Sequence, residues 1–267
     1  MIKSPKQFGK VLVSGRFLTY IFDSNKWRTL FAISGIFLPV SKRRWLVAQN
    51  AESHIWNLPE TSSTYEHPSF LNEGIKSDFI IKNSLSAIGL TLEDLLKDRV
   101  VIDVGCGPAS AILDSDSPKR KIGIDPMPFP SWVRHRYQQS GFELIIKPVE
   151  ELIASDFREI SKEIPLVIMY NALQHFKDPY MGLELLSELL KTHELLIIDY
   201  ANAPADDAHP QVITHQRVSR MLNRIGYQID QARVIEMKKD GLIEYGHGSA
   251  AQILLVKAML VLDSEIH

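Results

Sequence analysis

The sequence has little cysteine and no excess of charge of either sign. Both features exclude some classes of site and of binding partner. Among 267 residues there is one cysteine, Cys106, so an internal disulfide and a multi-cysteine zinc site are both excluded. The 30 Lys and Arg residues are balanced by 32 Asp and Glu, so no overall field favours DNA, RNA or an acidic membrane. These features favour a cytoplasmic protein with a small or neutral substrate.

The sequence also has no apolar run long enough to cross a bilayer. The longest candidate, Leu30–Val40, has about half of the roughly 20 residues that a spanning helix needs, and we expect no signal peptide. Its apolar residues surround most of a helix, which is typical of a helix packed on the main domain or on a second subunit of a homodimer. Because Lys42, Arg43 and Arg44 follow, peripheral membrane contact through residues 27–44 is the less favoured alternative.

A polar connector at 57–69, dense in turn-forming residues, divides the chain. Residues 1–75 are predicted to form a helical extension or lid, and residues 76–267 one α/β domain, in which short β-branched runs alternate with helical ones. The predicted strands are 100–104, 121–124, 143–146, 166–170, 195–199, 232–237 and 252–258. Five strands separated by helices, followed by two closely spaced strands, predict a doubly wound, mainly parallel seven-stranded sheet with an antiparallel edge strand.

Several helices of this domain are predicted from their periodicity and their ends. One begins near Phe79 and stops at Gly89, and the next begins at the N-cap Thr91. Another stops at Gly226 after apolar residues at the i, i+3, i+4 and i+7 positions, which are Val218, Met221, Leu222 and Ile225. Between the first two strands, we expect a short and rather polar helix within Ser110–Arg120.

The strongest local pattern is Val100–Pro108 (VVIDVGCGP), an apolar strand that leads into an acidic residue and a Gly-x-Gly turn. Gly105 and Gly107 would let a cofactor approach the backbone at the carboxyl end of this strand. Asp103 is placed to order the loop or, through water, to hold an ammonium group. Asp125 ends the next strand (IGIDP), where a carboxylate accepts hydrogen bonds from ribose hydroxyls. Each motif alone is weak, but the two on consecutive strands predict a nucleotide site.

These motifs resemble the first two motifs of class I S-adenosylmethionine-dependent methyltransferases, which have a Rossmann-like fold. KPVEEL (147–152) is similar to the segment after their third strand, and residues 166–190 resemble their fourth strand and the helix after it. The resemblance covers about 100–258 and implies S-adenosylmethionine as cofactor and S-adenosylhomocysteine as its product. The cofactor-binding residues that it implies are Asp103, Gly105, Cys106, Gly107, Asp125, Pro126, Met127, Val149, Glu150, Asn171 and Gln174.

The sequence departs from this family's pattern in three places. The third small position of the glycine turn is Ala109, the first helix is short and polar, and residues 191–194 replace the usual glycine pair before the fifth strand. None of these departures removes a group that cofactor binding requires.

Histidines supply the candidates for the chemistry at the acceptor. Methyl transfer from a sulfonium needs an in-line arrangement and, for a hydroxyl acceptor, the removal of a proton. His175, after the fourth strand, is the candidate for the base or for a substrate contact, because imidazole exchanges protons near neutral pH. A structural histidine that caps the next helix is the alternative. His209, His215 and His247 are weaker candidates for contact with the acceptor.

We expect no metal site. Asp206, Asp207 and His209 are closely spaced, but an acidic loop is more often solvated than metal-binding. The metal-dependent subclass has an aspartate where this chain has Tyr170–Asn171. Enzymes that methylate amide or nucleobase nitrogen often carry a Pro-Pro-aromatic turn at this place, whereas Ala172 follows here, so the predicted acceptor is a hydroxyl of a small molecule or glycan.

Glu52 and Trp56 share a helical face that loosely resembles lid segments of small-molecule and glycan methyltransferases, although a packing helix explains it equally well.

A nicotinamide-dependent dehydrogenase shares the fold, but no third glycine follows Gly107. A non-catalytic scaffold or activating subunit that binds the cofactor is the second alternative, and the intact Asp103 and Asp125 argue against it.

Overall fold

The structure is a computed structural model that describes residues 40–56, 79–157, 160, 164–203, 205, 209–238 and 250–260. Most of the predicted extension lies outside these residues, including nearly all of the apolar run at 30–40 and the whole connector at 57–69. Asp206, Asp207 and His247 lie outside them too. Within the described part of the chain, no helix has the length and apolar character needed to span a membrane.

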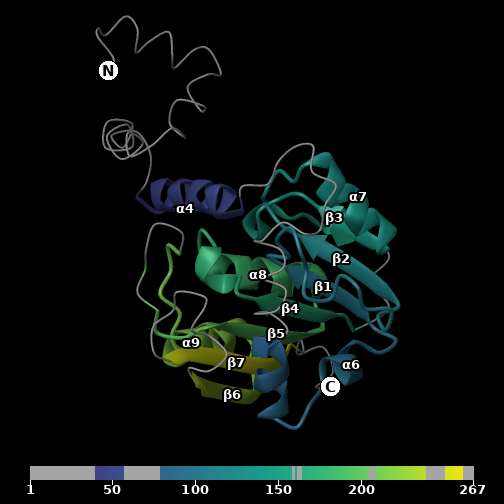
Figure 1. The fold of residues 1–267 in the computed structure, drawn as a ribbon. Helices are drawn as coiled ribbons and strands as arrows, with labels where there is room; N and C mark the ends of the chain where they lie inside the picture. The colour runs from purple at the N-terminus through teal and green to yellow at the C-terminus, as the bar shows by residue number, and fades with distance from the viewer. Residues whose placement is uncertain are drawn as a thin grey trace, which may run out of the picture.

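Seven strands form one sheet in the order β3-β2-β1-β4-β5-β7-β6 (Figure 1). Their bounds are β1 Val100–Val104, β2 Arg120–Ile124, β3 Phe142–Ile145, β4 Leu166–Tyr170, β5 His193–Tyr200, β6 Tyr227–Lys238 and β7 Ala250–Leu260. Strands β1 to β5 pair in parallel. Strand β7 lies antiparallel between β5 and β6, so β6 forms the edge of the sheet. The predicted mainly parallel, doubly wound, seven-stranded sheet is confirmed.

The helices begin and end at residues that the sequence marks. Their bounds are α4 Val40–Trp56, α6 Leu92–Leu96, α7 Ser131–Gln139, α8 Pro179–Leu190 and α9 His215–Ile225, with 3-10 turns at η1 Val149–Glu151, η2 Ala154–Phe157 and η3 Leu173–His175. Residues 79–86 are also helical. The Thr91 side chain accepts a hydrogen bond from the Asp94 amide, and Gly226 ends α9 with a φ of 102°. The predicted N-cap and stop are therefore confirmed.

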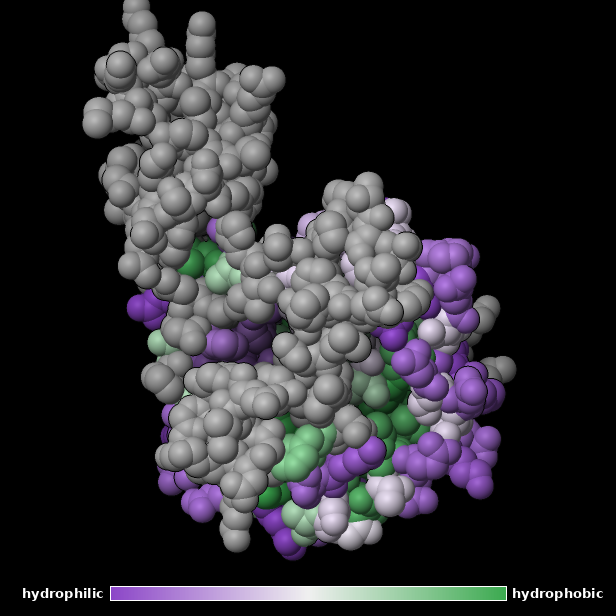
Figure 2. Space-filling model, viewed as in Figure 1, coloured by the Kyte–Doolittle hydropathy of each residue, from purple (hydrophilic) through white to green (hydrophobic). Residues whose placement is uncertain are grey.

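Alternate residues of each strand face opposite sides of the sheet, and helices cover both sides. Ile102 and Val104 belong to a core that includes residues of α8 and α9, whereas Val101 belongs to a core with residues 80–85, α6 and α7. All five residues of β1 are buried, as expected of a parallel strand covered on both faces. Where α7 and β3 lie in the view of Figure 2, the described surface is mainly hydrophilic.

The expected helix within Ser110–Arg120 is wrong, because this segment forms a turn followed by irregular backbone that leads into β2. A side chain donates hydrogen bonds to backbone carbonyl groups that would accept bonds from backbone amides in a helix. The Lys121 ammonium donates to the carbonyls of Leu113 and Ser115 at 3.0 and 2.8 Å. Such local side-chain bonds offer the backbone an alternative to a helix, and serine is a common residue in such turns.

Candidate active site

A cavity lies at the carboxyl ends of β1 to β4, next to the point where the strand order reverses between β1 and β4. Crossover connections leave this point toward opposite faces of the sheet, which opens a crevice in doubly wound folds. Helix α4 supplies the other wall, through Trp45, Gln49, Glu52 and Trp56. These positions are three or four residues apart, so they share one helical face. The helix therefore faces the strand ends across the cavity.

The two glycines of the first turn fit their positions for different reasons. Both have a positive φ, 75° at Gly105 and 57° at Gly107. A Cβ added at Gly105 would lie 2.5 Å from the Ala172 Cβ, so this glycine allows the turn after β1 to pack on the turn after β4. A Cβ at Gly107 would have only Trp56 near it, at 3.9 Å. Gly107 therefore leaves room beneath α4.

Asp125 links the end of β2 to the glycine turn. One carboxylate oxygen accepts a hydrogen bond from the Gly107 amide at 2.9 Å, and the other accepts one from the Met127 amide at 2.8 Å. Burial raises the pKa of Asp125 to about 6, and the two amide bonds oppose this effect. A carboxylate has about four acceptor positions, so each oxygen retains capacity for a further donor.

Asp103 orders the glycine turn through a neighbouring hydroxyl, which is one of the two roles predicted for it. Its carboxylate accepts a hydrogen bond from the Ser110 hydroxyl at 2.5 Å, and burial raises its pKa to about 7. The Tyr137 hydroxyl accepts a bond from the Ser110 amide and donates to the Gly107 carbonyl, each at 2.8 Å. Sequence reasoning missed Tyr137, because no local pattern distinguishes it from any other buried residue of α7.

The turns after β3 and β4 line the remainder of the cavity. Val149 and Glu150 are both in the lining, and a Glu150 oxygen also accepts a hydrogen bond from the Asp178 amide at 3.0 Å. Burial raises the pKa of Glu150 above its ordinary value. Asn171 lines the cavity with a φ of 51°. Gln174 is buried and does not belong to the lining; its amide donates to the Asn171 side chain at 2.5 Å.

The other predicted cofactor-binding residues and His175 meet at this cavity. The lining contains Asp103, Gly105, Cys106, Gly107, Asp125, Pro126, Met127, Val149, Glu150, Asn171 and His175. Trp45 and Gln49 also belong to it and were not predicted, because they lie in the extension, before the motifs begin.

A buried acid holds the turn that carries His175. Asp199, near the end of β5, accepts hydrogen bonds from the Leu173 and Tyr200 amides, both at 2.8 Å. Burial raises its pKa to about 7, while these amide bonds favour the charged form. Sequence reasoning missed this role too, although an acid that ends the apolar run LLIID was a visible signal.

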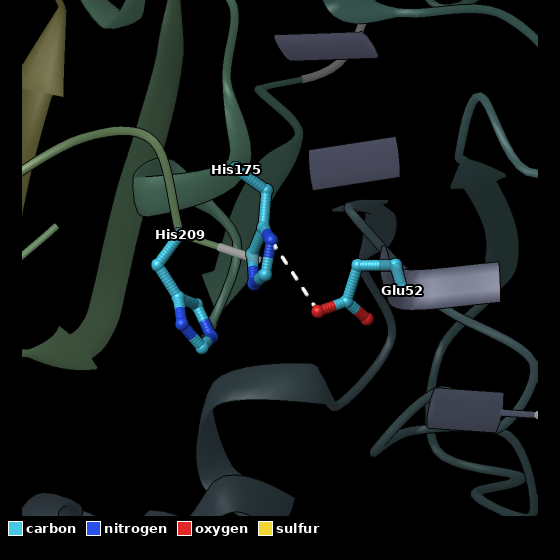
Figure 3. A group of neighbouring side chains, drawn as sticks. All are labelled: Glu52, His175 and His209. Atoms are coloured by element: carbon cyan, nitrogen blue, oxygen red, sulfur yellow. Dashed lines mark ion pairs between the residues drawn. The ribbon is translucent and has the colours of Figure 1, made fainter. Parts of the chain in front are cut away.

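Three side chains from distant parts of the sequence lie close together, and two of them, Glu52 and His175, line the cavity (Figure 3). The His175 Nδ1 atom lies 3.6 Å from the Glu52 Oε1 atom, and the His175 and His209 rings are 4.7 Å apart and tilted by 55°. Glu52 comes from α4, His175 from η3 and His209 from the segment before α9. His215, the other described histidine candidate, begins α9 and does not belong to this group.

No protein-family model and no curated sequence matches the chain significantly, but solved structures do. One is 1,6-didemethyltoxoflavin-N1-methyltransferase from Burkholderia thailandensis, solved with 1,6-didemethyltoxoflavin and S-adenosylhomocysteine. It aligns with a TM-score of 0.59 and 13% identity, over 84% of this chain and 92% of that chain. The chain has the fold of the class I methyltransferases.

Two further solved structures align with the chain over most of their own length. The N-methyltransferase NodS from Bradyrhizobium japonicum aligns with a TM-score of 0.50 and 13% identity, over 80% of this chain and 98% of that chain. The YcgJ protein from Bacillus subtilis aligns with a TM-score of 0.50 and 15% identity, over 67% of this chain and 99% of that chain. At these identities the likeness concerns the fold, so the activity has to be argued from the site.

Proposed function

We propose that the protein is an S-adenosylmethionine-dependent methyltransferase that acts on a hydroxyl oxygen of a small molecule or glycan. The observation that supports this most is the joining of the Gly107 turn and the buried Asp125 carboxylate at one cavity, at the reversal of the strand order. In this fold, cofactors bind at the carboxyl ends of the strands.

The residues of the cavity fit the adenosyl half of this cofactor. Gly107 leaves space below Trp56, and Asp125 has acceptor capacity for ribose hydroxyls. Val149 offers buried apolar surface for a purine, and Asp103 offers a buried carboxylate that can balance an ammonium group. S-adenosylmethionine, when bound, supplies a methyl group activated by a positively charged sulfur.

The acceptor half of the site is assigned to the wall formed by α4 and the turn after β4. His175 lines this wall, and we assign to it the action on the acceptor hydroxyl, either as base or through contact. Two of the similar structures are named for methylation of nitrogen, so an amine acceptor is the second candidate. The turn Asn171–Leu173, which lacks the two prolines of many amide and nucleobase methyltransferases, supports the hydroxyl.

A thermal-shift experiment tests the cofactor class. We expect S-adenosylhomocysteine to raise the melting temperature of the full chain, because a ligand at about 100 times its Kd stabilises the folded state by about 2.7 kcal/mol. NAD+ and NADP+ are expected to leave it unchanged. A shift with a nicotinamide cofactor alone would support the dehydrogenase alternative, and no shift with any of them would contradict the proposal.

A transfer assay with a labelled methyl donor tests the activity. Hydroxyl acceptors are expected to be labelled, and His175→Ala is expected to lower kcat by about 10²- to 10⁴-fold if His175 is the base. If only amines were labelled, the acceptor atom would be a nitrogen and not a hydroxyl oxygen. Binding of the cofactor without transfer to any acceptor, across a broad panel, would favour the non-catalytic scaffold.

A further inference from the structure

We propose that Glu52, His175 and His209 bind one divalent transition-metal ion, with Zn²⁺ the best-matched ion, at the acceptor wall of the cavity. One ligand atom from each side chain can be chosen so that all three lie within 4.8 Å of one another. Figure 3 shows the His175 ring between the Glu52 carboxylate and the His209 ring. The three ligand groups thus come together from three separate segments of the chain.

The donor set favours a transition metal over Mg²⁺ or Ca²⁺. Two imidazole nitrogens and one carboxylate oxygen suit Zn²⁺ and ions of similar softness, whereas Mg²⁺ and Ca²⁺ take oxygen ligands almost throughout. Three protein ligands also leave a coordination position open, which is the arrangement of catalytic zinc sites. Because Glu52 and His175 both line the cavity, that position can be reached from the acceptor side.

Glu52 and His175 form an ion pair when His175 is protonated, and their separation also fits two ligands of a shared ion. Their atoms are 3.6 Å apart, which is longer than a hydrogen bond. Two ligands of a tetrahedral ion with bonds of about 2.1 Å lie about 3.4 Å apart. His209 has to move closer by rotation of its side chain, and its ring already packs against that of His175 at 4.7 Å.

The surroundings of the three residues hold the ligands in place. The His175 and Glu52 side chains are 16% and 18% exposed, so the group is shielded from solvent while still facing the cavity. The segment that carries His209 is fastened to the His175 turn, because the Gln211 amide donates to the Gln174 carbonyl at 3.1 Å. Two of the three ligands therefore belong to one hydrogen-bonded unit.

Sequence reasoning excluded a metal because Tyr170–Asn171 replaces the expected acid after the fourth strand. The acidic loop with Asp206, Asp207 and His209 was the other ground for this expectation, and neither ground connected Glu52, in the extension, with the histidines. The ion would bind an oxygen of the acceptor at its open position and lower the pKa of a bound hydroxyl, whose proton then passes to water, so that His175 would act on the acceptor as a ligand of the ion and not as the base. This role rests on the proposed function, whereas binding of the ion does not.

Metal titration of the full chain, in the absence of cofactor and acceptor, tests the proposal. After removal of bound metal with EDTA, we expect calorimetry to detect one Zn²⁺ per chain, and Co²⁺ to give a visible absorption band when it occupies the same site. Glu52→Gln and His209→Ala are each expected to lower the Zn²⁺ affinity at least about tenfold. His135→Ala on α7 and Glu188→Gln on α8 are the matched exposed controls and are expected to change nothing.

Wild-type protein that binds no stoichiometric Zn²⁺ would overturn the proposal. So would binding that is unaffected by both Glu52→Gln and His209→Ala, since the ion would then lie elsewhere. The same preparations are titrated with S-adenosylhomocysteine. Cofactor binding without metal binding contradicts this inference alone, and metal binding without cofactor binding contradicts the proposed function alone.

Discussion

The carboxylate of Asp125 is the single group on which the cofactor assignment depends most. It is 7% exposed, and burial raises its pKa to about 6. The ionised form is the stronger acceptor for ribose hydroxyls. We therefore expect the affinity for S-adenosylhomocysteine to fall as the pH is lowered through about 6, measured by equilibrium dialysis.

Asp125→Asn is expected to weaken this affinity at pH 7.5 by about 10- to 100-fold, because hydrogen bonds to a charged group contribute about 1.5–3 kcal/mol. The variant should also lose the dependence on pH near 6. Asp114→Asn, an exposed acid that lies outside the cavity lining, is the control. An Asp125→Asn protein that binds as tightly as wild type would remove the ribose role from this residue.

Gly105 is constrained by packing, and this has a measurable consequence. Gly105→Ala is expected to destabilise the protein by about 2–4 kcal/mol, from overpacking against Ala172 and from a side chain at positive φ. Adding Ala172→Gly removes the clash but not the strained φ, so the double variant should recover part of the loss. Urea unfolding measures both effects, and a double variant no more stable than Gly105→Ala would show that the contact is unimportant.

At the scale of elements, the sequence predicts best where periodicity and end signals agree. Helix α9 has both, and its predicted apolar face and Gly226 stop are confirmed. Strand β6 begins earlier than predicted, because an irregularity in the pairing between Ile229 and Gln231 interrupts the apolar alternation that starts at Tyr227, while the pairing with β7 continues on both sides of it. The turn structure at 110–120 depends on the Lys121 side chain, whose contacts no local pattern reveals.

Helix α4 is the element whose part in ligand binding can be followed directly. It places Trp45 and Trp56 in the cavity lining, so cofactor binding should change the intrinsic tryptophan fluorescence. The double variant Trp45→Phe/Trp56→Phe is expected to lose this change in fluorescence. The control is Trp132→Phe, because Trp132 lies on α7 and outside the cavity lining, and this variant is expected to keep the change. A signal that persists in the double variant would show that α4 does not cover the bound cofactor.

At the scale of the whole molecule, buried acids should set an unusual pH dependence of stability. Burial raises the pKa of Asp199 from 3.8 to about 7, so the folded state holds this proton more tightly than the unfolded chain. The free energy of unfolding therefore rises as the pH falls from above 7 toward the unfolded value. Asp199→Asn should reduce the rise between about pH 7.5 and about pH 6 by about 1 kcal/mol. An unchanged slope in urea unfolding would contradict this.

The two halves of the site differ in how far the sequence predicts them. The cofactor half comes from strand ends, where one local motif places Gly107 and a second places Asp125. The acceptor half brings Glu52 together with His209, two residues that no spacing rule connects. Only the tertiary fold places them close together. Their proximity is the reason why we propose a metal site, although none is expected from the sequence.

Isothermal titration of the full chain with S-adenosylhomocysteine tests the central claim most directly. We expect saturable binding of one equivalent to the wild-type protein, with the heat abolished or strongly reduced in Asp125→Ala. No heat with the wild-type protein, or binding that Asp125→Ala leaves unchanged, would show that this cavity is not a site for the adenosyl cofactor.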